Sequence, residues 1–300
     1  MLISRRNGTL TLVTQPDHGR LAGELARYWG NDEFALSPFR EEFLFTAAHH
    51  DDGWHDIDAV PAWAEQHLRP AHFLELPLPT VAAAFTTAID AVYEASPLAG
   101  ALHSMHFTGF YRSRWGVDDA PHVDHPDVPG IVEHEEQRRA RAIRESWPAD
   151  RPRADFERRL WHSYEILQVL DLLSLFACLV DLDRESTADA QVMARTLSAI
   201  DQEPTRRTIM RCPRNDIGDR IDLAVSVAAP GIVAVDPYPF ADPEVAVEVP
   251  VRVLADEPYG SADAAAAAYH AAPVQMRGLS FVDAGASSTA NESEVEHVRD

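Results

Sequence analysis

The chain has 300 residues, and its 46% hydrophobic and 25% charged residues are typical of a soluble globular protein with an ordinary core. Its 48 acidic residues outnumber its 26 basic residues, and the resulting formal charge of −22 argues against nucleic-acid and anionic-membrane partners. All of the basic residues are arginines, which excludes enzymes that need a Schiff-base lysine or a phosphate-loop lysine.

The sequence lacks the features that direct a chain to a membrane or to an oxidising compartment. Cys178 and Cys212 are too few for a disulfide framework or a four-cysteine zinc site. The first residues lack the apolar segment of a secretory signal, and no run approaches the about 18 consecutive apolar residues of a membrane span. We therefore expect a cytoplasmic protein.

Strand and helix signals follow one another along the chain. Two short strands, at 2–5 and 9–14, flank Asn7-Gly8, a dipeptide typical of tight hairpins. Helical periodicity then predicts six helices, at 16–29, 41–51, 80–95, 96–106, 132–147 and 155–182. After Pro204, alternating apolar residues predict strands at 221–227, 245–253 and 274–282, with a short helix at 261–272.

These elements predict one mainly α-helical domain over 1–283. Its helical body spans 16–200, and a small antiparallel β unit combines 205–283 with the hairpin of 1–15. Residues 284–300 are small, polar and acidic, which favours a disordered tail. We interpret the segment 236–240 (DPYPF) as a rigid turn that packs its aromatic residues on the helical body.

Several polar side chains lie on the apolar faces of predicted helices. His18 is in register with Leu21 and Leu25, and Asp171 is in the middle of the most apolar helix. Burying a carboxylate there costs several kcal/mol unless it is paired or binds a metal. Converging imidazoles and carboxylates bind divalent transition metals such as iron, manganese, zinc or nickel. The candidate ligands are His18, His50, Asp51, His106 and Asp171.

This arrangement resembles the HD superfamily of metal-dependent enzymes. In that superfamily the metal is bound by a histidine on one helix, a His-Asp doublet ending a second helix before a glycine, and an aspartate in a late helix. His18, the doublet His50-Asp51 in AAHHDDGW, and Asp171 in YEILQVLDLLSL match this signature within residues 16–180. The resemblance implies an HD-like helical bundle. HHDDGW together with DPYPF is also similar to an uncharacterised bacterial family of unknown function, which implies no activity.

Other histidines leave the ligand set open. His49 stands where the HD superfamily usually has an apolar residue and competes with His50 for the metal; we favour His50. Two-metal members of the superfamily carry further histidines between the doublet and the late aspartate. Here the candidates are His72, His103 and His106, and His106 is favoured because it ends the apolar stretch of its helix. We expect one or two divalent ions, iron or manganese before zinc or nickel.

The resemblance implies hydrolysis of a phosphate ester through a metal-activated water. Asp51, His106 and Arg112 are then candidate catalytic residues, while Arg20 and Arg114 are candidates for binding a small anionic or polar substrate. The alternative is oxidation of a small polar substrate, because a branch of the superfamily that includes myo-inositol oxygenase uses a di-iron centre. A non-catalytic metal-binding or ligand-sensing protein is the third hypothesis, and a homo-oligomer is left open.

Overall fold

The computed structural model describes residues 1–6, 8–112, 125–179, 206–215 and 217–285. The helices are α1 (Gln15–Tyr28), α2 (Arg40–His49), α3 (His55–Ala59), α4 (Leu78–Ala95), α5 (Pro97–Phe110), α7 (Val128–Ser146), α8 (Arg153–Leu179) and α10 (Ala262–Ala271). The strands are β1 (Leu2–Arg6), β2 (Thr9–Val13), β3 (Trp63–Ala64), β4 (Arg69–Pro70), β5 (Arg206–Pro213), β6 (Arg220–Ala229), β7 (Ile232–Asp236), β8 (Glu244–Ala255) and β9 (Gln275–Asp283). Short 3-10 turns lie at Asp52–Trp54, Glu65–His67 and Phe73–Glu75.

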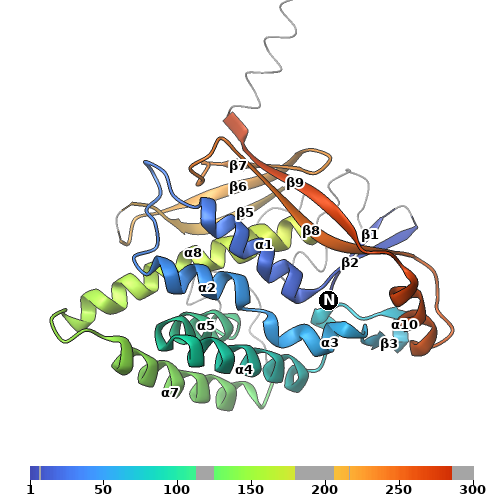
Figure 1. Cartoon of the computed structure of the whole chain (residues 1–300), viewed down its shortest axis with the longest axis horizontal. Coiled ribbons are helices and arrows are strands. Elements are labelled where there is room, and N and C mark those ends of the chain that lie inside the picture. The colour runs from blue at the N-terminus through green and yellow to red at the C-terminus, as the bar shows by residue number, and fades with distance from the viewer. Residues whose placement is uncertain (7, 113–124, 180–205, 216, 286–300) are drawn as a thin grey trace, which may run out of the picture.

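Strands from both ends of the chain form one large sheet (Figure 1). Its order is β1-β2-β8-β9-β7-β6-β5, and neighbouring strands are antiparallel except β7 and β9, which are parallel. The N-terminal hairpin joins the sheet through β2, where Leu10 pairs with Leu254 of β8. The chain passes through β8 and α10 between β7 and β9, and this crossover allows the parallel pairing.

The expectation of a mainly α-helical, HD-like bundle with a small antiparallel β unit is therefore wrong. The sheet has seven strands, contains a parallel pair and contributes side chains to the main core. The sequence pattern does not predict β5, because arginines and a register shift between Ile209 and Cys212 interrupt its alternation of apolar residues. Alternating apolar residues show that a strand has a buried face, but they do not show how many strands share a sheet.

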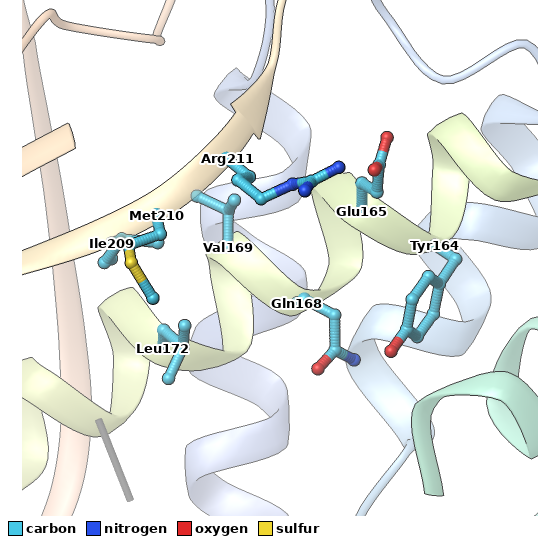
Figure 2. A pocket seen from close by; sticks show the side chains of 8 residues that line it. All are labelled: Tyr164, Glu165, Gln168, Val169, Leu172, Ile209, Met210 and Arg211. Atoms are coloured by element: carbon cyan, nitrogen blue, oxygen red, sulfur yellow. The ribbon is translucent and has the colours of Figure 1, made fainter. Parts of the chain in front are cut away.

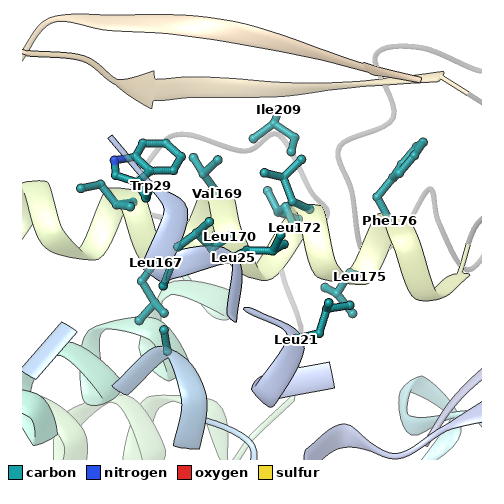
Figure 3. Close-up of a cluster of buried hydrophobic side chains, with 14 of the residues drawn as sticks. Leu21, Leu25, Trp29, Leu167, Val169, Leu170, Leu172, Leu175, Phe176 and Ile209 are labelled. Carbon is teal, nitrogen blue, oxygen red and sulfur yellow. The ribbon is translucent and has the colours of Figure 1, made fainter. Parts of the chain in front are cut away.

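One face of the sheet is covered by two helices. α1 and α8 lie against it, and α2, α4, α5 and α7 lie on the side of these helices away from the sheet (Figure 1). Figure 3 shows Val169 and Leu172 of α8 directed toward Ile209 of β5, with Leu21 and Leu25 of α1 in the same cluster. α8 is therefore central, packed against the sheet on one side and against other helices on the other.

The central helix α8 is buried along most of its length. Every residue from His162 to Leu179 is buried. The helix is long and apolar enough to cross a membrane, but all of the qualifying stretch lies inside the protein. The core helix of a soluble protein meets the same criteria, so this burial fits a soluble protein.

The start of α1 places His18 on the buried side of the helix. The Thr14 side chain accepts a hydrogen bond from the backbone N–H of Asp17, and Pro16 occupies the first turn. This cap fixes where the helix begins. His18 and Leu21, which are three residues apart, consequently face the core together.

The segment 236–240 packs its aromatic residues on the helical body, as the sequence predicts. The Phe240 ring lies 6.4 Å from the Trp29 ring at the end of α1. The Tyr238 hydroxyl donates a hydrogen bond to the Phe281 carbonyl, and the Asn31 side chain donates one to the Tyr238 carbonyl. These contacts join the end of α1 to β9.

Parts of two predicted regions lie outside the described residues. These are 180–200 of the predicted helical body and 286–300 of the predicted disordered tail. The division into a single domain over 1–283 stays a prediction.

Candidate metal centre

Four helical segments bring five side chains to one buried point. His18 comes from α1, His50 caps the C-terminus of α2 and Asp51 follows it, while His106 comes from α5 and Asp171 from α8. Each of the five residues is at most 3% exposed. We call these five residues the donor cluster.

The polar atoms of the donor cluster lie at the spacing of ligands around one ion. His18 Nε2 and His50 Nε2 lie 3.3 and 3.4 Å from Asp171 Oδ1. Asp51 Oδ2 lies 3.6 Å from His50 Nε2, and it also accepts a hydrogen bond at 3.1 Å from Nδ1, the other ring nitrogen of His18. Atoms bound about 2.0–2.2 Å from a common ion are about 3–3.5 Å apart, so these separations fit a metal site.

Hydrogen bonds fix which ring nitrogens face the centre. His50 Nδ1 donates to the Ala47 carbonyl at 2.9 Å, so Nε2 carries the lone pair that points into the donor cluster. The Gln168 amide nitrogen lies 2.5 Å from His106 Nδ1. With the amide turned so that its oxygen takes this place, Nδ1 would donate to it and Nε2 would be the nitrogen that faces the centre. A ring N–H that donates to a carbonyl in this way orients histidines in metal sites.

Several buried atoms of the donor cluster have no hydrogen-bond partner among the residues that the structure describes. They are His18 Nε2, His50 Nε2, Asp51 Oδ1 and Asp171 Oδ2. Buried polar atoms without partners are costly, and a cation among them would satisfy the nitrogen lone pairs and the carboxylates together. The described residues therefore contain buried His/Asp groups that could hold a metal, namely His18 with His50 and Asp51, and His50 with His106 and Asp171.

Charge in the metal-free chain is balanced between imidazoles and carboxylates. Burial raises the pKa of Asp171, but contacts with His18 and His50 outweigh this and hold that pKa well below its usual range. Burial also lowers the pKa of His18, yet the Asp171 and Asp51 carboxylates raise it to about 9. A divalent cation would take over the role of these protons, because metal ligands bind in their deprotonated form.

The two histidines of the doublet segment have different surroundings. His50 is fully buried in the donor cluster, whereas the His49 side chain is 43% exposed and contacts Asp52 Oδ2 at 2.6 Å. The carbonyl at Ala47 orients His50, since α2 ends there and leaves that carbonyl available. The preference for His50 over His49 remains a prediction that a pair of variants can test.

We expect His50→Ala to weaken metal binding by about tenfold or more, because His50 belongs to both of the buried His/Asp groups that could hold a metal. His49→Ala removes the neighbouring imidazole and is the matched control, expected to bind metal as the wild type does. Titration of each metal-stripped variant with Mn²⁺ or Fe²⁺ measures both affinities. A larger loss in His49→Ala would reverse the assignment.

The additional histidines are placed differently. His103 lies beside the donor cluster, with its ring centroid 6.4 Å from that of His106, and it is fully buried. His72 instead caps a 3-10 turn, where its Nδ1 accepts a hydrogen bond from the backbone N–H of Leu74. Neither histidine belongs to the His/Asp groups found in the described residues.

The candidate arginines lie outside the donor cluster or outside the described residues. Arg20 contacts Asp17 at 2.9 Å and is half-exposed. Arg112 pairs with Glu136 of α7. Arg114 lies within 113–124, outside the residues that the structure describes. Arg20 and Arg112 thus each have an acidic partner on the chain.

Sequence reasoning missed Gln168, which contacts His106. Gln168 is 6% exposed and lies three residues before Asp171 on α8. An amide on the most apolar helix, one turn from a buried carboxylate, was the available signal. Its contact with His106 depends on how α5 packs against α8, which the sequence pattern does not reveal.

Close backbone approaches set the position of the doublet. A Cβ at Gly53 would overlap the Ala84 carbonyl oxygen of α4 and lie 2.8 Å from the carbonyl carbon. A Cβ at Gly23 of α1 would lie 2.6 Å from the Ala48 Cβ of α2. Glycine at these positions therefore lets α1 and α4 approach the segment that carries His50 and Asp51.

Comparison with protein families identifies the family of the chain. A family described as a protein of unknown function, DUF3891, matches residues 1–256. The chain belongs to this family. The matched region runs from the N-terminal hairpin through β8 and contains the whole donor cluster. Comparisons with curated proteins and with solved structures gave no match.

Proposed function

We propose that this DUF3891 protein is a metal-dependent hydrolase that acts on a phosphate ester through a metal-activated water. The observation that carries the proposal is the donor cluster, in which buried His and Asp side chains converge and four polar atoms have no hydrogen-bond partner in the described part of the chain. The resemblance of its residues to the HD signature supports hydrolysis of phosphate esters as the reaction. The substrate in this proposal is small and anionic.

One ion suits the donor cluster better than two. Both His/Asp groups include His50, and an imidazole nitrogen has a single lone pair, so His50 Nε2 can bind only one ion. The mixture of imidazole and carboxylate donors suits iron or manganese. We therefore propose a single divalent ion of iron or manganese, with zinc and nickel as the alternatives.

The roles of the residues follow from their contacts. A bound divalent ion lowers the pKa of a coordinated water and polarises a phosphoryl oxygen. Asp171 Oδ1 lies 3.3 and 3.4 Å from His18 Nε2 and His50 Nε2, so these three atoms would bind the ion together as direct ligands. Asp51 uses Oδ2 to orient His18, and its Oδ1 is available to accept a proton at the centre. Burial excludes bulk water and strengthens each of these electrostatic contacts.

A second candidate function rests on one of the two buried His/Asp groups. His50, His106 and Asp171 have the two-histidine, one-carboxylate composition that non-haem iron oxygenases use. Oxidation of a small polar substrate by iron and O₂ is therefore the alternative to hydrolysis. The identity of the bound metal and the consumption of O₂ separate the two.

The test begins with elemental analysis of protein produced in iron- and manganese-supplemented medium. We expect about one ion per chain, because His50 cannot serve two ions. The loaded protein is then assayed with p-nitrophenyl phosphate and bis(p-nitrophenyl) phosphate, and O₂ consumption is recorded in parallel. Metal-dependent release of p-nitrophenol supports hydrolysis.

Three other results would change the conclusion. Iron together with O₂ consumption and no phosphatase activity would favour the oxygenase. A chain that takes up no metal under these conditions would contradict both enzymatic functions. Metal without either reaction would favour a metal-binding or ligand-sensing protein.

A further inference from the structure

The Gln168 amide lies beside a proposed metal ligand. Gln168 is on α8, three residues before Asp171, and is 6% exposed. Figure 2 shows its side chain extending from α8 on the side away from β5. The space between α8 and β5 is about 20 Å³, enough for one water, so a substrate does not reach Gln168 from that side. The polar contact of Gln168 is with His106 of α5, whose Nδ1 lies 2.5 Å from the amide nitrogen.

Neighbouring rings restrict the orientation of the His106 ring. Its centroid lies 4.8 Å from the Phe110 ring and 4.9 Å from the His50 ring, and both contacts are edge-to-face. The Phe85 ring lies 6.3 Å away, and His106 is 1% exposed. A ring enclosed in this way cannot turn freely, so packing keeps Nδ1 toward Gln168.

A metal bound through Nε2 changes what His106 Nδ1 requires. A neutral imidazole has one N–H and one lone pair. When Nε2 gives its lone pair to a metal, the ring keeps its single proton on Nδ1, which then needs a hydrogen-bond acceptor. In the structure the Gln168 amide presents its nitrogen to Nδ1, and an amide nitrogen only donates. The amide must therefore exchange the places of its nitrogen and oxygen when the metal binds.

The Gln168 amide oxygen can make this exchange. Oε1 is buried and has no hydrogen-bond partner among the described residues. A half-turn about the last bond of the side chain swaps the oxygen and the nitrogen with little change in shape. The backbone of α8 does not have to move. The exchange brings the unused oxygen to His106 Nδ1.

We propose that Gln168 is a positioning residue that selects the ring nitrogen of His106 for the metal. Its amide oxygen accepts a hydrogen bond from Nδ1, which keeps the lone pair of Nε2 directed at the donor cluster. The inference rests on the proposed function, because it requires a metal in the donor cluster. Residues that orient a ligand in this way change metal affinity by about 10- to 100-fold.

Two substitutions in the full-length chain separate hydrogen bonding from packing. Gln168→Glu keeps an oxygen acceptor on a side chain of the same shape, whereas Gln168→Met keeps the bulk and removes the acceptor. Titration of the metal-stripped proteins with Mn²⁺ measures the affinities. We expect Gln168→Glu to bind Mn²⁺ at least as tightly as the wild type, and Gln168→Met to bind it about 10- to 100-fold more weakly. A role in packing alone gives the reverse order, because glutamate buries a charge.

The matched control is Gln15→Met. It makes the same change at another buried glutamine, at the start of α1 and outside the donor cluster. We expect this variant to bind Mn²⁺ as the wild type does. Equal losses in Gln15→Met and Gln168→Met would show a general effect of removing a buried amide and would overturn the inference.

A spectroscopic measurement tests the same point on the wild type, without a substitution. In zinc-loaded protein with isotope-labelled histidine, long-range proton–nitrogen correlations distinguish a metal-bound ring nitrogen from a protonated one. We expect His106 to bind zinc through Nε2 and to carry its proton on Nδ1. Zinc bound through Nδ1 would overturn the inference.

The inference is also overturned if Gln168→Met binds Mn²⁺ as tightly as the wild type, or if Gln168→Glu binds it more weakly than Gln168→Met. Its failure is distinguishable from that of the proposed function. A metal-dependent hydrolase whose metal affinity does not depend on Gln168 would refute only the positioning role. A chain whose metal affinity depends on Gln168 but which hydrolyses no phosphate ester would refute only the hydrolase. A chain that takes up no metal would refute both.

Discussion

Replacing Asp171 with asparagine is expected to abolish stable metal binding. The carboxylate faces His18 Nε2 and His50 Nε2 at 3.3 and 3.4 Å and stays ionised despite its burial, because these histidines hold its pKa well below the usual range. Asparagine keeps the shape but removes the charge. The loss of affinity should exceed the about 10- to 100-fold that outer-shell partners contribute, since Asp171 is proposed as a direct ligand. Metal content after dialysis and titration with Mn²⁺ measure it.

The matched control for this variant is Asp52→Asn. It makes the same chemical change directly after the doublet, at a carboxylate that contacts exposed His49. We expect this variant to keep its metal. Thermal unfolding adds a second measurement, because a ligand that binds only the folded chain raises the melting temperature. Metal should stabilise wild type and Asp52→Asn but not Asp171→Asn; an Asp171→Asn protein with full metal content would show that Asp171 is not a ligand.

Replacing Gly53 with alanine is expected to destabilise the whole fold. The added Cβ would overlap the Ala84 carbonyl oxygen and lie 3.0 Å from the Ala88 backbone nitrogen, both in α4. Backbone atoms of a helix cannot move aside as a flexible side chain can, so α4 must shift away from the doublet. The cost should reach or exceed the upper end of the about 1–3 kcal/mol that is typical of overpacking. Urea unfolding followed by circular dichroism measures it.

Gly130→Ala is the control for a glycine that permits no close approach. Gly130 lies in α7, and a Cβ there would meet no atom within 4 Å. Alanine favours helix over glycine by up to about 1 kcal/mol, so this variant should be as stable as the wild type or slightly more stable. Equal stability of Gly53→Ala and the wild type would contradict the packing described for the doublet.

The resemblance to the HD signature concerns a few side chains, and the sheet shows how little such a match says about the remaining chain. His18, His50, Asp51 and Asp171 gather at one point. Around them, however, a seven-stranded sheet covers α1 and α8. The donor cluster requires only that four helical segments meet. Either helices or a sheet can pack against the opposite faces of these segments. Membership of the HD superfamily therefore remains a hypothesis for this DUF3891 protein.

Local sequence patterns are enough to indicate which side chains point inward. Apolar residues recur every three or four positions, so a polar residue in the same register must share the buried face, as His18 and Asp171 do. The cap at Thr14 and Asp17 likewise places the start of α1 from local chemistry alone. These are local properties, since each depends on residues within one or two helical turns.

Which atoms those side chains contact depends on how the helices and strands pack together. The contact of Gln168 with His106 and the approach of Gly53 to Ala84 each join segments that are distant along the chain. The order of the strands depends in the same way on long-range pairing. Periodicity gives the direction of a side chain from its own helix or strand, but contacts depend on the distance and angle between elements, which packing of the whole core sets.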